Sequence, residues 1–187
     1  MSKLLSEIAH IQVGPLVKQG NEGILVYFQI SHFHQDGTLK TPIEPTLEKE
    51  QVSPKHLLQP GDILFAAKGT NNFAYHFKGE MDGAVASGSF IIIRILNQNR
   101  VLPAYLTWYF NLPLVSEQLK TQAKGTSIPS ISTNTLSHWP IEIPSVQIQH
   151  LIIKIAEAAQ QEAKIQHKIS ALKNQLINQT LFKAITK

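Results

Sequence analysis

Residues 145–187 read SVQIQHLIIKIAEAAQQEAKIQHKISALKNQLINQTLFKAITK and contain neither glycine nor proline. Apolar side chains recur in this stretch at alternating steps of three and four residues, which is the heptad spacing of a coiled-coil helix. The residues expected to form the contact seam are Ile148, Leu151, Ile155, Ile165, Ile169, Leu172 and Leu176. Ala158 belongs to the same series, and Glu162 is its one polar member. The sequence therefore predicts one long helix that begins after Ser145, a suitable N-cap.

The length of this helix favours a partner. A helix of about 36 residues would be roughly 54 Å long, which is too long to pack fully against the preceding part of the chain. We therefore expect it to pair with the same helix of a second copy, in antiparallel sense. The alternative is a bent helix that folds back on its own domain.

Charge is distributed unevenly between the two parts. Residues 1–145 carry 11 Lys and Arg against 11 Asp and Glu, so the formal net charge of +4 lies wholly in the C-terminal segment. A sequence pI near 9.3 favours a polyanionic partner. Scattered lysines are explained equally well by a solvated helix face, and Glu44, Glu48 and Glu50 form an acidic patch in the first part.

Composition excludes several classes of protein. The chain has no cysteine, which excludes a disulfide scaffold, a Cys-ligated metal site and thiol catalysis. Apolar runs such as Phe90–Ile93 are far too short to span a membrane. The N-terminus lacks the apolar core of a signal peptide. We expect an intracellular, cytoplasmic protein with no membrane partner.

Local patterns before residue 145 predict an α+β domain with a mixed β-sheet and short helices. Strands are expected at 24–30, 62–67, 84–86 and 90–96. Pro103 and Pro113 each suit the first turn of a helix, the second running to about Gln122. Exposed loops are expected at 31–50, 68–79 and 125–137, and an extended piece at 139–144. The predicted domains are 1–144 and 145–187.

Motifs of covalent chemistry are absent from the sequence. It contains no Gly-x-Ser-x-Gly, no Walker A and no Gly-x-Gly-x-x-Gly. His32 and His34 would place two imidazoles on one face of a strand, but no third ligand of clear spacing accompanies them. Asp62, beside a Pro-Gly turn, is interpreted as a turn residue. We therefore expect neither a catalytic site nor a metal site in this chain.

Two loops favour binding instead. The first, 68–72, offers a cation, a glycine and two amides, and the second, 124–130, offers a cation and several hydroxyls. Amides can pair bidentately with adenine, and lysine can reach guanine or phosphate. The residues expected at base edges are Lys68, Thr70, Asn71, Asn72, Lys124, Thr126 and Ser127. Phosphate contacts are expected from Lys78 and Ser130. Taken singly, each loop is a weak signal, and its composition fits an ordinary surface loop better than a binding site.

The order of the sequence motifs resembles a known family. The motifs are Leu5–Ala9 followed by Gly14, Pro60–Phe65 followed by Lys68-Gly69, Ala86-Ser87 before Phe90–Arg94, Pro103–Leu106, Gly125–Ser127, and Pro144–Ile152. Together they resemble the specificity subunit of type I restriction–modification systems. Gln149 and Ile152 match the start of its spacer helix, whereas Ser145 and Ile148 depart from the usual Pro and acidic residue.

The resemblance implies sequence-specific recognition of duplex DNA by a non-catalytic subunit. It implies that S-adenosylmethionine, ATP and magnesium are bound only by partner subunits, the methyltransferase and, where present, the restriction subunit. A usual member has two recognition domains and two spacer helices, and this sequence has one of each. We therefore expect a half-length form that acts as a homodimer on a gapped palindrome. The alternative is a coiled-coil adaptor whose head binds protein rather than DNA.

Overall fold

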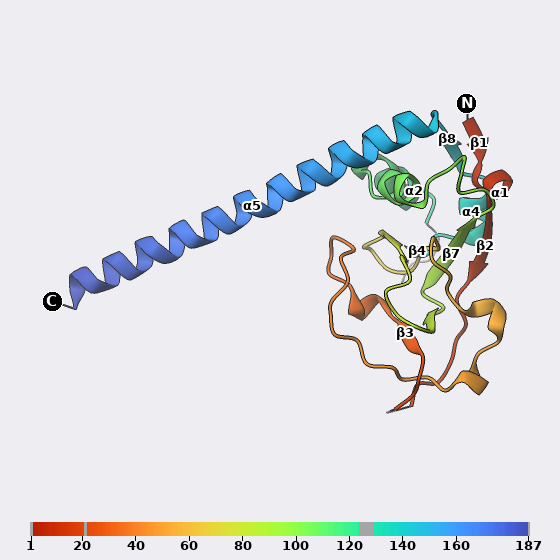
Figure 1. Cartoon of the computed structure of the whole chain (residues 1–187), viewed down its shortest axis with the longest axis horizontal. Coiled ribbons are helices and arrows are strands. Elements are labelled where there is room, and N and C mark those ends of the chain that lie inside the picture. Colours follow the sequence, from red (N-terminus) through yellow and green to blue (C-terminus); the bar gives the residue numbers. More distant parts are fainter. Residues whose placement is uncertain (1, 21, 124–128, 187) are drawn as a thin grey trace. The chain divides into compact units, whose positions relative to one another are not determined.

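The computed structural model describes residues 2–20, 22–123 and 129–186 (Figure 1). The chain divides into two compact units, Met1–Gln149 and His150–Lys187. The first unit, called the head below, contains the sheets and short helices. The second consists of most of the long helix. The predicted α+β fold with a long C-terminal helix is confirmed.

A four-stranded antiparallel sheet forms the centre of the head. Its order is β2 (Ala9–Val13), β7 (Phe90–Ile95), β4 (Ile63–Ala66) and β5 (Ala74–His76). Along β7, Ile91 and Ile93 belong to one apolar cluster, whereas Phe90 and Ile92 belong to the other. Strands buried on both faces read as continuous apolar runs rather than alternating ones. This explains the unbroken run of apolar residues at the start of β7.

Helices cover one face of this sheet. They are α1 (Leu5–Ile8), α2 (Pro103–Phe110), α3 (Pro113–Thr121) and α4 (Thr133–Ser137). Leu106, Phe110 and Leu119 from these helices share a buried cluster with Phe65 and Ile93 of the sheet. The antiparallel pair β1 (Ser2–Leu4) and β8 (Pro140–Glu142) completes this side.

An aromatic cluster fills the opposite face. Here β3 (Val26–Phe28) pairs in parallel with β6 (Ala84–Ala86). Three 3-10 turns lie in the connections, at Ile30–His32, Lys49–Gln51 and Pro54–His56. The buried rings are Phe28, Phe33, Phe73, Phe77 and Phe90. The phenylalanines of the predicted 68–79 loop are therefore core residues.

Two predictions of local structure in the first half of the chain were wrong. The expected strand 24–30 is limited to Val26–Phe28, since Ile24 is exposed and a 3-10 turn begins at Ile30. The expected 68–79 loop contains β5. A side chain from α2's C-cap helps to fix that strand, because Asn111 accepts the Ala74 N–H at 2.8 Å and donates to the Ala74 carbonyl at 2.9 Å. No local pattern shows this long-range pairing.

The predicted loop 125–137 was also wrong at its end, where α4 forms. The Ser132 hydroxyl accepts the backbone N–H of Thr135 at 3.0 Å and so caps the helix. Serine at an N-cap satisfies one of the free amides of a first helical turn. A short helix in a Ser/Thr-rich stretch was missed because its capping residue was interpreted as loop composition.

Asp62 does more than shape a turn. Its carboxylate accepts the Gln59 N–H at 2.8 Å, as a turn residue would, but it is only 1% exposed. Arg94 of β7 binds it with two bonds, Nε to Oδ1 at 2.7 Å and Nη2 to Oδ2 at 2.6 Å. The hydrogen bond to Asp62 raises the pKa of the Arg94 guanidinium. This bidentate pair joins the start of β4 to β7.

The long helix α5 spans Val146–Ile185, 40 residues or roughly 60 Å. It starts where the sequence predicted, with the Ser145 carbonyl accepting the Gln149 N–H at 2.9 Å. The seven predicted seam residues are between 41% and 65% exposed. No helix within the described residues is both long and apolar enough to cross a bilayer.

Gln149 ties the first turn of α5 into the head. Its side chain is fully buried. Its Nε2 donates to the carbonyls of Arg100 and Pro144, both at 2.9 Å, and its Oε1 accepts the Leu102 N–H at 2.8 Å. Leu102 is the N-cap residue of α2. One amide side chain therefore joins the starts of two helices.

We predict that Gln149→Leu lowers the free energy of unfolding of the head by about 2–4 kcal/mol, because backbone groups of Arg100 and Leu102 lose their buried partner. Urea unfolding followed by the fluorescence of Trp108 and Trp139 measures this. The matched control, Gln147→Leu, alters an exposed residue two positions earlier. Equal midpoints for the two variants would contradict the assigned role of Gln149.

Candidate nucleic-acid interface

The register of the central sheet gathers several loops at one end. Val13 pairs with Ile91, and Ala66 pairs with Phe90, so β2 and β4 both finish where β7 begins. The segments that follow Val13 and Ala66, and the turn that precedes Phe90, therefore leave the sheet at the same end. We call it the loop end.

The two loops predicted to bind DNA meet at the loop end. Lys68 forms an isolated antiparallel bridge with Ser130. Gly69 donates its N–H to the Pro129 carbonyl at 2.9 Å, and Ile131 donates to the Ala67 carbonyl at 2.9 Å. Residues about sixty positions apart in sequence thus form one continuous surface.

Within the first loop, side chains divide into exposed and inward-facing ones. Lys68, Thr70 and Asn71 are exposed. Gly69 has a φ of +98°, a conformation that favours glycine and that turns the chain between the lysine and the threonine. Asn72 is half-buried, and its Nδ2 donates to the Ala66 carbonyl at 2.8 Å. Its amide therefore holds the loop.

The remaining predicted contacts have different positions. Lys78 follows β5 and lies near the opposite end of the sheet, next to the Pro60–Gly61 turn, where Gly61 donates to the Phe77 carbonyl. The structure thus separates it from Lys68. Lys124, Thr126 and Ser127 lie outside the described residues.

A groove at the loop end contains polar residues that the sequence did not reveal. It has a volume of about 390 Å³ and is lined by Leu16, Val17, Tyr27, Gln29, Ile30, Ser31, Lys68, Ser87, Gly88 and Ser89. Lys40 lies beside it, since its Nζ donates to the Ser31 carbonyl at 2.9 Å. These groups come from five separate segments, and no motif links them in sequence.

His32 adds no positive charge to this region at neutral pH. Partial burial, and next the charge of Lys40, lowers the pKa of its imidazole below the usual value. Its Nδ1 accepts the Gln29 N–H at 3.3 Å. The residue lies in a 3-10 turn, so the strand arrangement proposed for His32 and His34 does not form. In the part of the chain that the structure describes, no three His, Asp or Glu side chains gather as a metal site.

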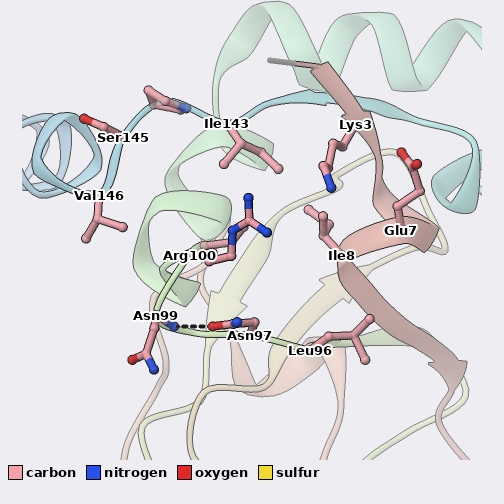
Figure 2. Close-up of a pocket in the computed structure, with 12 residues that line it drawn as sticks. Lys3, Glu7, Ile8, Leu96, Asn97, Asn99, Arg100, Ile143, Ser145 and Val146 are labelled. Atoms are coloured by element: carbon pink, nitrogen blue, oxygen red, sulfur yellow. Dashed lines mark hydrogen bonds between the residues drawn. The ribbon is translucent and has the colours of Figure 1, made fainter.

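A second pocket lies where α5 begins. It has a volume of about 380 Å³, and its walls include Ile8, Leu96 and Val146, together with the cations Lys3 and Arg100 (Figure 2). Ile8 directly precedes β2 and Leu96 directly follows β7. The pocket is therefore at the opposite end of the sheet from the loop end. The sheet of the head therefore has a groove at its loop end and a pocket at its opposite end.

Comparison with known proteins identifies the fold. Residues 2–181 match the family model "Type I restriction modification DNA specificity domain". No curated protein matches the chain in sequence.

Solved structures with a similar fold include subunits of type I restriction–modification systems. The HsdS subunit from Thermoanaerobacter tengcongensis is 20% identical with a TM-score of 0.69, and the match covers 91% of this chain and 44% of that one. The type I S subunit from M. genitalium is 13% identical with a TM-score of 0.58, over 86% of this chain and 39% of that one. A structure described as showing complex assembly and conformational transition of the type I R-M system is 21% identical, with a TM-score of 0.69 and coverage of 91% and 44%. This chain spans less than half the length of each.

We predict that Asn72→Ala lowers the free energy of unfolding by about 1 kcal/mol, because the buried Ala66 carbonyl loses its donor. Asn71→Ala is the matched control. Asn71 is exposed, and its Nδ2 donates to the carbonyl of Gln35, an exposed residue of a separate loop, at 2.9 Å. Urea unfolding of both variants measures the difference. The roles assigned to the two amides are wrong if Asn71→Ala lowers the free energy of unfolding more than Asn72→Ala does.

Proposed function

Because the chain belongs to the family of type I restriction–modification DNA specificity domains, we propose that it is the subunit that selects the DNA target of such a system. In this proposal residues 1–144 are the recognition domain and residues 145–187 the spacer and dimerisation helix. The protein acts in the cytoplasm and has no catalytic site of its own.

The observation that carries the proposal is the meeting of two loops at the loop end. Lys68, Thr70 and Asn71 are exposed beside Ser130, and the backbone bonds to Pro129 and Ile131 hold the two segments together. A cation, hydroxyls and an amide on a fixed backbone are the groups that read base edges and bind phosphates. Lys124, Thr126 and Ser127 precede Ser130 in the loop that the sequence predicts at 124–130, and we propose them as further base contacts.

The lack of excess positive charge in residues 1–145 implies that partner subunits contribute to DNA binding. Residues 1–145 have 11 cations and 11 anions, so they hold no excess charge to neutralise phosphates. Non-specific affinity for DNA comes mainly from such neutralisation. The chain alone should therefore bind DNA weakly, and a methyltransferase subunit supplies the additional cationic surface.

The methyltransferase subunit provides the chemistry as well. S-adenosylmethionine binds to that subunit, and ATP and magnesium bind to a restriction subunit where one is present. The pocket that contains Lys3, Arg100 and Val146 lies at the end of the head that is not used for DNA (Figure 2). We propose this pocket as one contact for the partner, and the exposed apolar face of α5 as a separate one.

A second copy of the chain pairs with the seam of α5. The support is the series of half-exposed apolar residues at heptad spacing, in a chain whose other described helices are all short. An antiparallel pair has a two-fold axis and places its two heads at opposite ends of the helices. Two identical heads related in this way read inverted copies of one half-site, which makes the target a gapped palindrome.

We predict that Lys68→Ala weakens binding of the assembled methyltransferase complex to its target duplex by about 1–3 kcal/mol. Gel shift over a range of salt concentrations measures the change. Lys78→Ala is the matched control, because it removes the same charge from a position away from the loop end. Equal weakening by both variants would contradict the loop end as the interface. Absence of any selective binding by the wild-type complex would favour the adaptor function.

We predict that Leu172→Asp converts the protein from a dimer to a monomer, because pairing would bury an unpaired charge. Light scattering measures the mass, which should fall from twice 20.9 kDa to 20.9 kDa. The control, Asn174→Asp, adds the same charge outside the seam and should leave the dimer intact. A wild-type mass of one chain would refute pairing through α5.

A further inference from the structure

Leu16 is the most exposed large apolar side chain of the described residues, at 97%. The next such residue in the head is Leu114, at 67%. Single apolar side chains on a protein surface are common and need no explanation in themselves. Two features set Leu16 apart: the rigidity of its backbone and the polar groups around it.

A buried tyrosine fixes the backbone on both sides of Leu16. The hydroxyl of Tyr27, a residue only 2% exposed, donates to the Pro15 carbonyl at 2.8 Å. The same oxygen accepts the Val17 N–H at 3.4 Å. One core side chain therefore holds the residue before Leu16 and the residue after it.

Close packing at Gly14 also holds the loop that carries Leu16. A Cβ on Gly14 would lie 2.1 Å from the Ala86 carbonyl oxygen and 2.4 Å from that of Ser87, so only glycine allows this approach. Gly14 also donates its N–H to the Phe90 carbonyl at 3.1 Å. The loop lies directly on the turn before β7. Leu16 is thus presented to solvent by a fixed backbone.

The groove that Leu16 lines also contains polar groups that suit a polyanion. Its lining includes Lys68, Ser31 and Ser89. Lys40 lies beside the groove, where it donates to the Ser31 carbonyl. An apolar side chain in a groove with lysines and hydroxyls matches DNA, in which apolar base faces lie between two charged backbones.

We propose that Leu16 is an apolar wedge, which enters a base-pair step of the target duplex while Lys68 and the serines of the groove bind the adjacent backbone. Proteins that deform DNA insert leucine and similar side chains between base pairs, which unstacks the step and kinks the duplex. The inference rests on the proposed function and adds a residue outside the two predicted loops. A step that unstacks easily would be preferred at this position.

The two hydrogen bonds of Tyr27 hold the backbone on both sides of Leu16 and so favour its insertion. A leucine on a loop without such bonds would have to be ordered at the moment of binding, and that ordering opposes association. Tyr27 is therefore a positioning residue: it acts on DNA only through the backbone of Pro15 and Val17. Tyr27→Phe keeps Leu16 and removes both hydrogen bonds of the hydroxyl.

The test uses the complex with its methyltransferase subunit and a duplex that this complex selects from a randomised pool. 2-Aminopurine is placed at successive positions of the duplex, where its fluorescence rises on unstacking. The wild-type complex should produce a rise at one step in each half-site. Leu16→Ala should abolish the rise and weaken binding about ten-fold. Tyr27→Phe should lower the fluorescence rise and the affinity for the duplex, but by less than Leu16→Ala does. Leu114→Ala truncates the next most exposed leucine of the head and should change neither the fluorescence rise nor the affinity.

A gap or an abasic site at the responding step, which removes the cost of unstacking, should restore the affinity of Leu16→Ala. The wedge is refuted if Leu16→Ala keeps the fluorescence rise, or if the variant loses the methyltransferase subunit rather than DNA. If the wild-type complex selects no sequence from the pool, the proposed function fails, and the wedge fails with it. Selective binding with no effect of Leu16→Ala overturns the wedge alone.

Discussion

The register of β7 between β2 and β4 is the constraint on which the rest of the head depends. Val13 opposite Ile91 and Ala66 opposite Phe90 bring the ends of two strands to the start of a third. A slip of one residue would move each side chain of β7 to the other face of the sheet. Because both faces are buried against different clusters, such a slip would place Ile and Phe side chains in cavities of the wrong shape. The bidentate Arg94–Asp62 pair fixes the same register at the other end of the strands.

Function follows from what this register places at each end of the sheet. At the loop end are Lys68, Ser130 and the Leu16 loop, which come from distant parts of the sequence. At the other end, Gln149 joins the first turn of α5 to the backbone before α2. The residues proposed to read DNA and the first turn of α5 are therefore held by one sheet. In the proposed function, a change of loop sequence alters the target without changing the assembly surface.

Sequence reasoning was most successful where the signal is local. Heptad spacing identified α5, and two prolines identified the starts of α2 and α3. It failed where a distant side chain decides the structure, as Asn111 does for β5. Sequence reasoning failed for the candidate interface for the same reason. Both loops were found by composition, but their meeting at Lys68 and Ser130, and the groove beside them, depend on strand pairing. Lys78 was predicted to contact phosphate at the same interface as Lys68, although β5 separates the two residues. The sequence could have predicted α4, because Ser132 is a typical N-cap residue.

In the proposed assembly, two identical heads joined through α5 read one DNA target. The decisive experiment is the sequencing of methylated bases in cells that express this chain with its methyltransferase subunit. Two identical heads should give a gapped palindrome whose half-site centres lie about 10 bp, one helical turn, apart. A methylated motif with two different half-sites, or methylation that does not depend on this chain, would contradict it.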